Sequence, residues 1–277
     1  MGVPGGPKAA LRLQGQWQEK DNRVVTRKGQ VREAFGSAAA TYDCHASVQR
    51  QVAEHLAEKI AALSLPPAPR VLELGCGTGF LFAALHPRLA YGEWVFSDLS
   101  PDMLARARER FGHMAHTRFV VMDGEQPAIA PNARFDLIVS SLSFQWFEHL
   151  PGSVEALRRL LAPGGTLAFS TMAIDSFHEW RASHAALGFK AATPDYPSPA
   201  SLQAQWPDAR LSDEHMPQTY GSARDFLMHL KGIGAQVPAA GRTPLPAGAM
   251  VRVMRRFEEQ GGQSTYHVAY CLIPAKH

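Results

Sequence analysis

Three glycines at every second position follow a short apolar run near residue 70. Val71–Leu74 is rich in strand formers, and Gly75, Gly77 and Gly79 come directly after it. Glycine suits a tight turn beneath a bound ligand, because it adopts positive φ and lets the backbone approach the ligand closely. The segment therefore predicts a strand, a turn and the start of a helix, with a ligand lying on the turn.

The glycine spacing and a nearby acid indicate which ligand the turn would hold. A dinucleotide fingerprint reads G-x-G-x-x-G and receives a pyrophosphate at the helix N-terminus. Here the third glycine comes one residue earlier, and Glu73 lies two residues before Gly75. A carboxylate favours a cationic group, such as an α-ammonium, over a phosphate. This pattern resembles the first motif of class I S-adenosylmethionine-dependent methyltransferases, although a turn that only joins a strand to a helix can have the same spacing.

Acids follow the next two predicted strands. Asp98 stands at the tip of the second strand, where a carboxylate can accept from both hydroxyls of a ribose. The same acid would serve NAD, so it does not discriminate between the two cofactors. Asp123, Gly124 and Glu125 follow the third strand. Because ligands of open α/β sheets bind at the carboxyl ends of the strands, the segment Ser140 to Trp146 after the fourth strand should also border the ligand.

The elements that must position these residues alternate regularly. The periodicity predicts a helix over 48–60, and apolar runs predict strands at Val71–Leu74, Trp94–Ser97, Phe119–Met122, Phe135–Val139, Thr166–Ser170 and Thr265–Ile273. The first five strands alternate with helices in units of about 25–30 residues, which is typical of a parallel sheet.

Composition suggests the boundaries of the domain. Residues 1–30 have few apolar anchors and predict a flexible tail, which leaves 31–277 as the folded domain. From 174 to about 220 the alternation breaks, and two helix-like pieces flank a proline-bearing stretch. An insertion at this place would form a lid over the strand ends.

Composition also excludes several classes of protein. The chain has 277 residues, 45% hydrophobic and 19% charged, which is ordinary globular material. No apolar run approaches the roughly 18 residues of a membrane helix and no secretory signal is evident, so we expect a cytoplasmic protein. The cysteines and histidines show no metal-ligand spacing, so we expect no metal. The net charge of +3 is too small to indicate nucleic acid, although it allows an acidic protein partner.

Several further blocks make the resemblance more specific. In chain order they are Phe35-Gly36-x-Ala38-Ala39-x-x-Tyr42, His45, Gln49-Arg50, Gln145-Trp146, Leu230-Lys231-Gly232-Ile233-Gly234-Ala235 and Thr265-Tyr266-His267. From about Val31 to the end, the chain resembles the malonyl-acyl-carrier-protein O-methyltransferases of biotin synthesis. The lid offers little to match.

This resemblance implies a fold, a cofactor and a partner. The fold is a Rossmann-like α/β fold with a mostly parallel seven-stranded sheet, an antiparallel C-terminal strand and an inserted helical lid. The cofactor is S-adenosyl-L-methionine, and the partner is the acidic malonyl-acyl-carrier protein, bound by a monomer. The implied cofactor contacts are Tyr42, Glu73, Gly75, Cys76, Gly77, Gly79, Asp98, Leu99, Met103, Asp123, Gly124, Glu125 and Ser140. Candidates to orient the acceptor are Tyr42, Gln145, Lys231 and Tyr266.

The implied reaction methylates the free carboxylate of malonyl-acyl-carrier protein or malonyl-coenzyme A, giving a methyl ester for pimeloyl and biotin synthesis. A carboxyl group with a pKa of about 3 to 4 is already ionised, so no general base is required. Three alternatives remain: a methyltransferase for another small-molecule carboxylate or hydroxyl, a dehydrogenase, and a cofactor-binding protein without catalysis. The glycine spacing and Glu73 disfavour the dehydrogenase, and the three acids Glu73, Asp98 and Asp123 favour a working site.

Overall fold

The computed structural model of the chain describes residues 26–130, 132–239, 241 and 245–276. The predicted tail of residues 1–30 lies outside the described residues up to residue 25. Helix α1 (Arg27–Ala38) already begins at Arg27, with Thr26 as its N-cap, so the last residues of the predicted tail are helical. Among the described helices, none combines the length and the apolar character that crossing a membrane requires.

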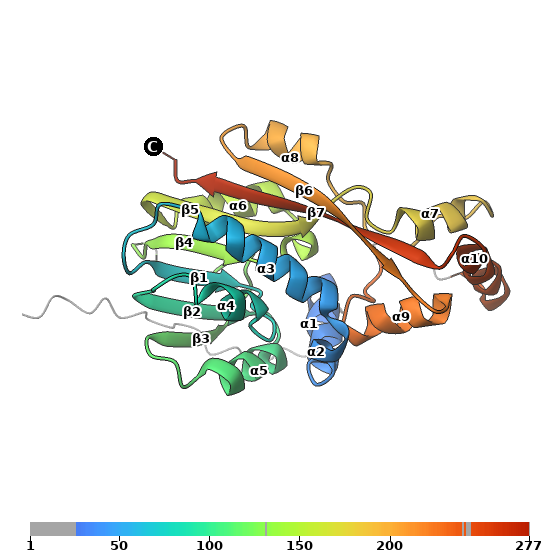
Figure 1. Cartoon of the computed structure of the whole chain (residues 1–277), viewed down its shortest axis with the longest axis horizontal. Coiled ribbons are helices and arrows are strands. Elements are labelled where there is room, and N and C mark those ends of the chain that lie inside the picture. The colour runs from blue at the N-terminus through green and yellow to red at the C-terminus, as the bar shows by residue number, and fades with distance from the viewer. Residues whose placement is uncertain (1–25, 131, 240, 242–244, 277) are drawn as a thin grey trace, which may run out of the picture.

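A seven-stranded sheet forms the centre of the molecule (Figure 1). Its strands are β1 (Arg70–Leu74), β2 (Glu93–Asp98), β3 (Thr117–Val121), β4 (Phe135–Ser140), β5 (Leu161–Met172), β6 (Arg210–Thr219) and β7 (Gln263–Pro274). The first five run parallel, whereas β7 pairs antiparallel with both β5 and β6. The strand order β3-β2-β1-β4-β5-β7-β6 confirms the predicted fold class, including the antiparallel C-terminal strand.

The strand order reverses at β1. From β1 the chain proceeds outward through β2 and β3, and it then returns to build β4 and β5 on the other side. Loops that follow β1 and β4 therefore diverge and leave a crevice at the carboxyl ends of these strands, which is the usual ligand site in open α/β sheets.

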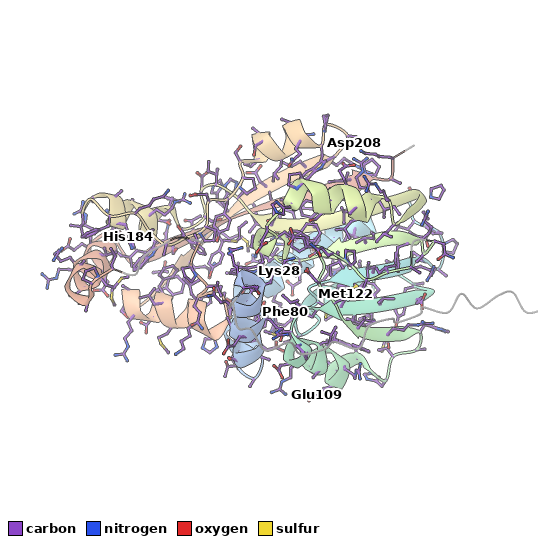
Figure 2. All side chains as sticks on the ribbon, turned by 180° about the vertical axis from the view of Figure 1, so that it is seen from behind. Lys28, Phe80, Glu109, Met122, His184 and Asp208 are labelled. Atoms are coloured by element: carbon purple, nitrogen blue, oxygen red, sulfur yellow. The ribbon has the colours of Figure 1, made fainter. Side chains whose placement is uncertain are left out.

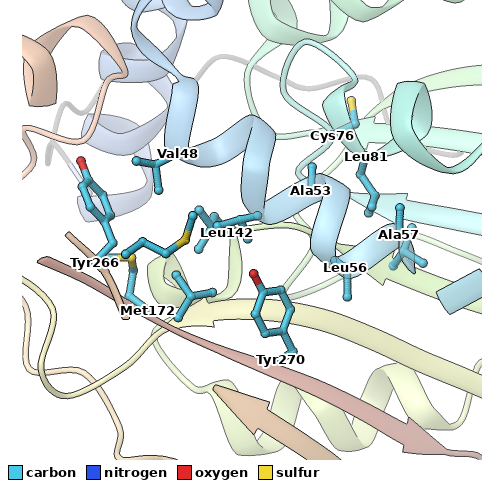
Figure 3. Packing of buried hydrophobic residues seen from close by; sticks show 14 of the residues in the cluster. Val48, Ala53, Leu56, Ala57, Cys76, Leu81, Leu142, Met172, Tyr266 and Tyr270 are labelled. Carbon is cyan, nitrogen blue, oxygen red and sulfur yellow. The ribbon is translucent and has the colours of Figure 1, made fainter. Parts of the chain in front are cut away.

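Helices cover both faces of the sheet. On one face lie α3 (Ser47–Ala61), α4 (Phe80–Leu85) and α5 (Pro101–Phe111), and on the other lie α6 (Leu150–Arg158) and α8 (Pro199–Gln205). The apolar side chains that recur every four residues along α3 are buried, as their pattern predicts. These are Val48, Val52, Leu56 and Ile60, each at most 1% exposed. Figure 3 shows this helix lying across β5 and β7, with Leu56 and Ala57 directed at the sheet.

Local signals in the sequence set several helix starts. Ser100 caps α5 by accepting a hydrogen bond from the Met103 N–H at 3.4 Å, and Pro101 fills the first helical position. Ser222 likewise caps α9 (Ala223–Gly232) by accepting from the Asp225 N–H at 3.1 Å. The sequence predicts both starts, since Ser100 precedes Pro101 and Ser222 precedes the apolar residues Phe226, Leu227 and Leu230, and a capping side chain acts over only three residues.

The predicted lid ends earlier than expected, because its last residues form the edge strand β6. Residues 210–219 were expected inside the insertion of 174–220, but they pair with β7 along their whole length. Their polar side chains are mostly exposed, Met216 is their only fully buried member, and Pro217 interrupts the pattern. Such features suit an edge strand that faces water, and they conceal the alternation on which the prediction relied. The helical part of the predicted lid is therefore the shorter segment between β5 and β6. Of its two helices, α7 (His178–Ala185) lies beyond the strand ends, whereas α8 packs on the sheet.

A second group of helices lies beyond the carboxyl ends of the parallel strands. It comprises α1, α2 (Tyr42–His45), α7, α9 and α10 (Ala247–Glu259), together with the short turn η1 (Phe144–Trp146) next to β4. Figure 1 shows α1 and α2 between the sheet and α9, and β6 and β7 reaching across to α7 and α10. The crevice is thereby closed over.

Candidate active site

The glycine turn has the backbone that its sequence predicts. Gly75, Gly77 and Gly79 have φ values of 60°, 54° and 89°. A Cβ placed on Gly75 would lie 2.3 Å from the Ser143 hydroxyl, whereas a Cβ on Gly77 would meet no protein atom within 4 Å. Gly77 therefore faces open space, where a ligand can approach its backbone.

This open space is a cavity between the glycine turn, the tips of β2 and β3, and helix α1. We call it the loop cavity. It is lined by Lys28, Val31, Arg32, Phe35, Tyr42, Gly75, Gly77, Asp98, Leu99, Ser100, Met103, Met122, Asp123, Gly124, Ser141, Leu142, Ser143, Trp146 and Phe147. Of the predicted cofactor contacts, Tyr42, Gly75, Gly77, Asp98, Leu99, Met103, Asp123 and Gly124 are on its wall.

Asp98 is fixed by the backbone at the tip of β2. Its Oδ2 accepts a hydrogen bond from the Gly77 N–H and its Oδ1 accepts from the Ser100 N–H, both at 2.8 Å. The side chain is buried, which raises the pKa of Asp98 to about 6 although the backbone hydrogen bonds act against this. The carboxylate therefore joins the glycine turn to the start of α5 and faces the loop cavity as a hydrogen-bond acceptor.

Lys28, which lies within the predicted tail, contacts the two acidic residues that follow β3. Lys28 Nζ lies 2.6 Å from Asp123 Oδ2 and 2.7 Å from Glu125 Oε2. Figure 2 labels Lys28 where the N-terminal helices meet the sheet. Burial alone would raise the pKa of Glu125, but the hydrogen bonds from Lys28 and from the His149 backbone outweigh it and lower the pKa. Lys28 thus ties α1 to the third strand across one end of the loop cavity.

Glu73 lies beneath the turn, in a small extension of the site. It is 1% exposed, and its Oε2 accepts a hydrogen bond from Trp94 Nε1 at 2.9 Å. Burial raises the pKa of Glu73 to about 8 in the absence of a cationic partner. The extension is also lined by Tyr42, Gly75 and Cys76, so the carboxyl group borders space that a cation can enter.

A second cavity lies under the lid, and we call it the lid cavity. It is lined by Phe35, Tyr42, Gln49, Leu142, Gln145, Trp146, Met172, Phe177, Trp180, His184, Ala192, Thr193, Pro194, Tyr196, Leu227, Leu230, Ile233, Ala235, Gln236, Val237, Pro238, Met250 and Tyr266. No lysine or arginine is among these described lining residues. The wall is therefore apolar with a few uncharged polar groups.

Several of these polar groups are buried without a partner. Gln145 Oε1, Gln49 Oε1 and Trp146 Nε1 make no hydrogen bond to any described residue, and the Tyr266 hydroxyl, which lies near that of Tyr220, forms no well-aligned one. Tyr266 is 2% exposed, and burial raises the pKa of its hydroxyl, so it stays protonated and can donate. Buried polar groups usually have partners, so a set of orphans around one cavity indicates that a polar ligand supplies them.

The two cavities meet at a shared wall. Phe35, Tyr42, Leu142 and Trp146 line both of them. Tyr42 also borders the extension beside Glu73, and its ring packs against Phe80 with a centroid distance of 6.0 Å. Burial raises the pKa of the Tyr42 hydroxyl, so it remains a neutral donor. A group bound in one cavity can therefore face a group bound in the other.

Some predicted site residues are not on these walls. Lys231 is exposed on α9 and lines neither cavity, because its neighbours Leu227 and Leu230 occupy the inner face of the helix. Gly79 opens α4, and its Cβ position faces Phe111 at 2.6 Å. Glu125 and Ser140 are buried behind the wall of the loop cavity. Glu125 instead supports Lys28.

Sequence reasoning missed some of the lining residues. Lys28 stands out because it is the basic group of the loop cavity that pairs with Asp123. Met122 at the end of the predicted third strand also lines this cavity, whereas Ser141 and Ser143 belong to the segment 140–146 that the sequence predicts at the ligand. The position of Met122 at a strand end was the available signal, whereas nothing in the sequence near Lys28 indicates its partners.

Comparisons with known proteins point to one family. The pattern of a methyltransferase domain matches residues 71–165. The biotin biosynthesis bifunctional protein BioCD of Bordetella avium is 46% identical over 240 residues, 87% of this chain and 51% of that protein, so the chain spans about half of that relative. The malonyl-[acyl-carrier protein] O-methyltransferase of Magnetococcus marinus is 40% identical over 250 residues, 88% of this chain and 92% of that protein.

Solved structures share the fold at low sequence identity. Phosphoethanolamine N-methyltransferase 2 of Haemonchus contortus has a TM-score of 0.56 and 14% identity, over 91% of this chain and 61% of that one. The DhpI complex with S-adenosylhomocysteine has a TM-score of 0.53 and 16% identity, over 90% of this chain and 98% of that one. These likenesses concern the fold alone.

Proposed function

The chain belongs to the malonyl-[acyl-carrier protein] O-methyltransferase family, and we propose that it methylates the free carboxylate of malonyl-acyl-carrier protein for biotin synthesis. It is an S-adenosyl-L-methionine-dependent methyltransferase. One observation of the site carries the proposal best: a cavity rimmed by acids meets a cavity of neutral donors at Tyr42, Leu142 and Trp146.

The loop cavity suits the donor. Asp98 would accept from the ribose hydroxyls, Asp123 would accept from the adenine amino group, and Glu73 would receive the α-ammonium group. Gly77 gives the backbone room that a ligand of this size needs. The bound cofactor supplies an electrophilic methyl group on a positively charged sulfur.

The lid cavity suits an anionic acceptor that must remain reactive. Tyr266 and Gln145 offer neutral hydrogen-bond donors, since the amide of Gln145 can turn from the Leu142 carbonyl, to which Nε2 now donates at 2.6 Å. An arginine in direct contact would hold the carboxylate more tightly and lower its nucleophilicity. Neutral donors orient the oxygen, while the apolar side chains of Phe177 and Trp180 limit its hydration.

The reaction also explains the lack of an acid–base pair in this arrangement. A malonyl carboxylate is ionised at neutral pH, so its oxygen attacks without losing a proton. Cation and anion combine to neutral products, and a site of low polarity favours such a loss of charge. The residues of the chain therefore act by alignment and by exclusion of water.

We further propose that the enzyme acts as a monomer in the cytoplasm. The proposed substrates are metabolites of the cell interior. Size-exclusion chromatography coupled to light scattering tests the oligomeric state.

A methyl-transfer assay tests the function. Purified enzyme and radiolabelled S-adenosyl-L-methionine are combined with malonyl-carrier protein, malonyl-coenzyme A, succinyl-coenzyme A or a hydroxyl-bearing acceptor. We expect the highest kcat/KM with malonyl-carrier protein. Failure to restore growth of a biotin auxotroph that lacks this methylation step, together with faster transfer to an unrelated acceptor, would show that another small-molecule carboxylate or hydroxyl is the substrate.

A further inference from the structure

Two histidines and an aspartate converge at the start of the lid, outside both cavities. His215 on β6 and His267 on β7 are directly paired across the strands, and their rings stack with centroids 4.0 Å apart and an angle of 18° between planes. Asp175, in the segment after β5, places Oδ2 at 3.2 Å from His215 Nε2 and 3.4 Å from His267 Nδ1. The three potential ligand atoms all lie within 4.8 Å of one another.

Hydrogen bonds fix which nitrogen of His267 carries a lone pair. His267 Nε2 lies 2.9 Å from Asp213 Oδ2, to which it donates. His267 Nδ1 accepts from the backbone N–H of Asp175 at 3.2 Å, so this nitrogen is unprotonated. A histidine that donates one nitrogen to a carboxylate and offers the other is the usual arrangement beside a metal.

A cation would resolve the contact between His267 and Asp175. The unprotonated Nδ1 and the carboxylate Oδ2 are both acceptors 3.4 Å apart, and the Asp175 N–H that Nδ1 accepts offsets their repulsion only in part. His215 supplies the second nitrogen on the same side. Since His215 and Asp175 are 49% and 52% exposed, an ion can reach the cluster from solvent and keep water in its remaining coordination position.

We propose that Asp175, His215 and His267 form a site for a divalent transition metal ion of the zinc class. Two imidazoles and one carboxylate suit Zn²⁺ or Co²⁺, which accept mixed nitrogen and oxygen ligands, better than Mg²⁺ or Ca²⁺, which prefer oxygen alone. The ion takes over the lone pair of His267 that now accepts from the Asp175 N–H, so this N–H needs another acceptor when the ion binds. Asp213 holds the His267 ring in place.

The place of the cluster gives the ion a structural consequence. The Ala173 N–H donates to the His267 carbonyl at 2.7 Å, and the Phe177 N–H donates to the Thr265 carbonyl at 2.7 Å. Phe177 also lines the lid cavity. A metal on Asp175 would therefore fasten the first residues of the lid to β6 and β7 and stabilise the folded chain.

Metal binding to the full chain tests the proposal without any activity measurement. The protein, freed of metal by chelation, is titrated with ZnCl₂ by calorimetry and with CoCl₂ by visible absorption. We expect saturable binding of one ion per chain, a cobalt absorption band in the visible, and a rise in melting temperature. His215→Ala and Asp175→Asn alter exposed side chains, and each should weaken binding by about tenfold or more; Asp213→Ala should weaken it by about 10- to 100-fold.

His55→Ala is the matched control. His55 on α3 forms a separate described histidine–carboxylate pair with Glu214 of β6, at 2.7 Å, but this pair has no third ligand. This variant should bind zinc as the unmodified chain does. Absence of saturable binding would overturn the proposal, and so would binding that survives both His215→Ala and Asp175→Asn or that falls equally in His55→Ala.

Discussion

The loop cavity and the lid cavity share a wall but are built by different means. In the loop cavity, Asp98 is held by two backbone N–H groups, and Asp123 is held by Lys28. In the lid cavity, Tyr266 and Gln145 present polar atoms that no described residue satisfies. The donor side is therefore organised before the ligand arrives, whereas the acceptor side is completed by its ligand.

This difference follows from what each ligand needs. A cofactor of fixed shape is gripped at several points by charged groups, and fixed acceptors reduce the ordering that binding requires. An acceptor carboxylate must be oriented but must keep a reactive oxygen, so it meets neutral donors. Changes in the loop cavity should therefore reduce binding of the donor, and changes in the lid cavity should reduce transfer while donor binding persists.

Gly77→Val should have the largest effect. The valine side chain would occupy the open space above the turn, and a β-branched residue at a φ of 54° is strained. We expect donor affinity, measured by calorimetry, to fall by at least about 100-fold, because strain of about 1–2 kcal/mol adds to the steric block.

Gly248→Ala is the control for this loss, since a Cβ on Gly248 of α10 also meets no atom within 4 Å. It should bind the donor normally. Near-normal donor affinity in Gly77→Val would mean that the ligand does not lie on the glycine turn, and the distinction between the two cavities would fail with it.

The pH dependence of donor binding tests the role of Glu73. Burial holds the pKa of Glu73 at about 8, so this carboxyl group is protonated at neutral pH when no cation is bound. A bound ammonium group favours the ionised form, and binding below pH 8 must then release a proton. We expect affinity to fall by about tenfold for each pH unit below 8, and calorimetry in buffers of different ionisation enthalpy to detect the proton.

Glu73→Gln should bind the donor weakly and without this slope. A pH-independent affinity of the unmodified chain between pH 6 and 9 would contradict the assignment of the ammonium group to Glu73.

The same carboxyl group should lower stability as the pH rises. Its folded-state pKa of about 8 exceeds the ordinary value of 4.5, so between these values the unfolded chain binds fewer protons. The free energy of unfolding contributed by Glu73 is then highest at low pH and decreases as the pH rises from 4.5 to 8. Urea unfolding of the ligand-free chain should show a shallower decrease in Glu73→Gln, and equal slopes would refute the shift.

Tyr266→Phe tests the other cavity. Loss of this donor hydroxyl should lower kcat/KM for the malonyl acceptor by about fivefold to tenfold, which corresponds to a typical net hydrogen bond of about 1–1.5 kcal/mol. Donor affinity should stay unchanged. Tyr270→Phe is the matched control on the same strand, because the Tyr270 hydroxyl donates to Glu214 and does not line the lid cavity. An equal loss of kcat/KM in both variants would mean that the substitutions disturb strand β7 and do not remove a contact with the acceptor.

Much of the wall of the loop cavity could be predicted from sequence because its signals are local. Gly75 and Gly77 follow their strand directly, and Asp98 ends the next one, so the order of residues along the chain suffices to place them. Parallel strands then bring these tips together. The capping residues Ser100 and Ser222 were found for the same reason.

The remaining features depend on contacts between distant parts of the chain. Lys28 and Asp123 are 95 residues apart, and Lys28 has no apolar pattern around it that predicts a buried partner. His215 and His267 show no metal-ligand spacing, since they meet only because β6 pairs with β7. Edge strand β6 itself was hidden by its polar residues, so the cluster could not be predicted before that strand was known.

Lys231→Ala should have the smallest effect. The sequence placed Lys231 among the groups that orient the acceptor, but its side chain is exposed and lines neither cavity. The glycines beside Lys231 give the 230–235 sequence block a structural reason. A Cβ on Gly232 would lie 2.7 Å from the His45 ring, and a Cβ on Gly234 would lie 2.9 Å from the Phe35 backbone. The block therefore packs α9 closely against α1 and α2, which carry part of the shared wall.

On this basis Lys231→Ala should keep turnover on a malonyl thioester within about twofold, as surface substitutions usually do. Gly232→Val should instead push α9 away from α2 and lower both the melting temperature and kcat/KM. Steady-state kinetics with malonyl-coenzyme A distinguishes these two variants. This small acceptor has no carrier protein to dock, so its turnover depends on the lid cavity alone. A marked loss of kcat in Lys231→Ala with this acceptor would mean that the lysine reaches the lid cavity in the working enzyme, and the acceptor side would then not be uncharged.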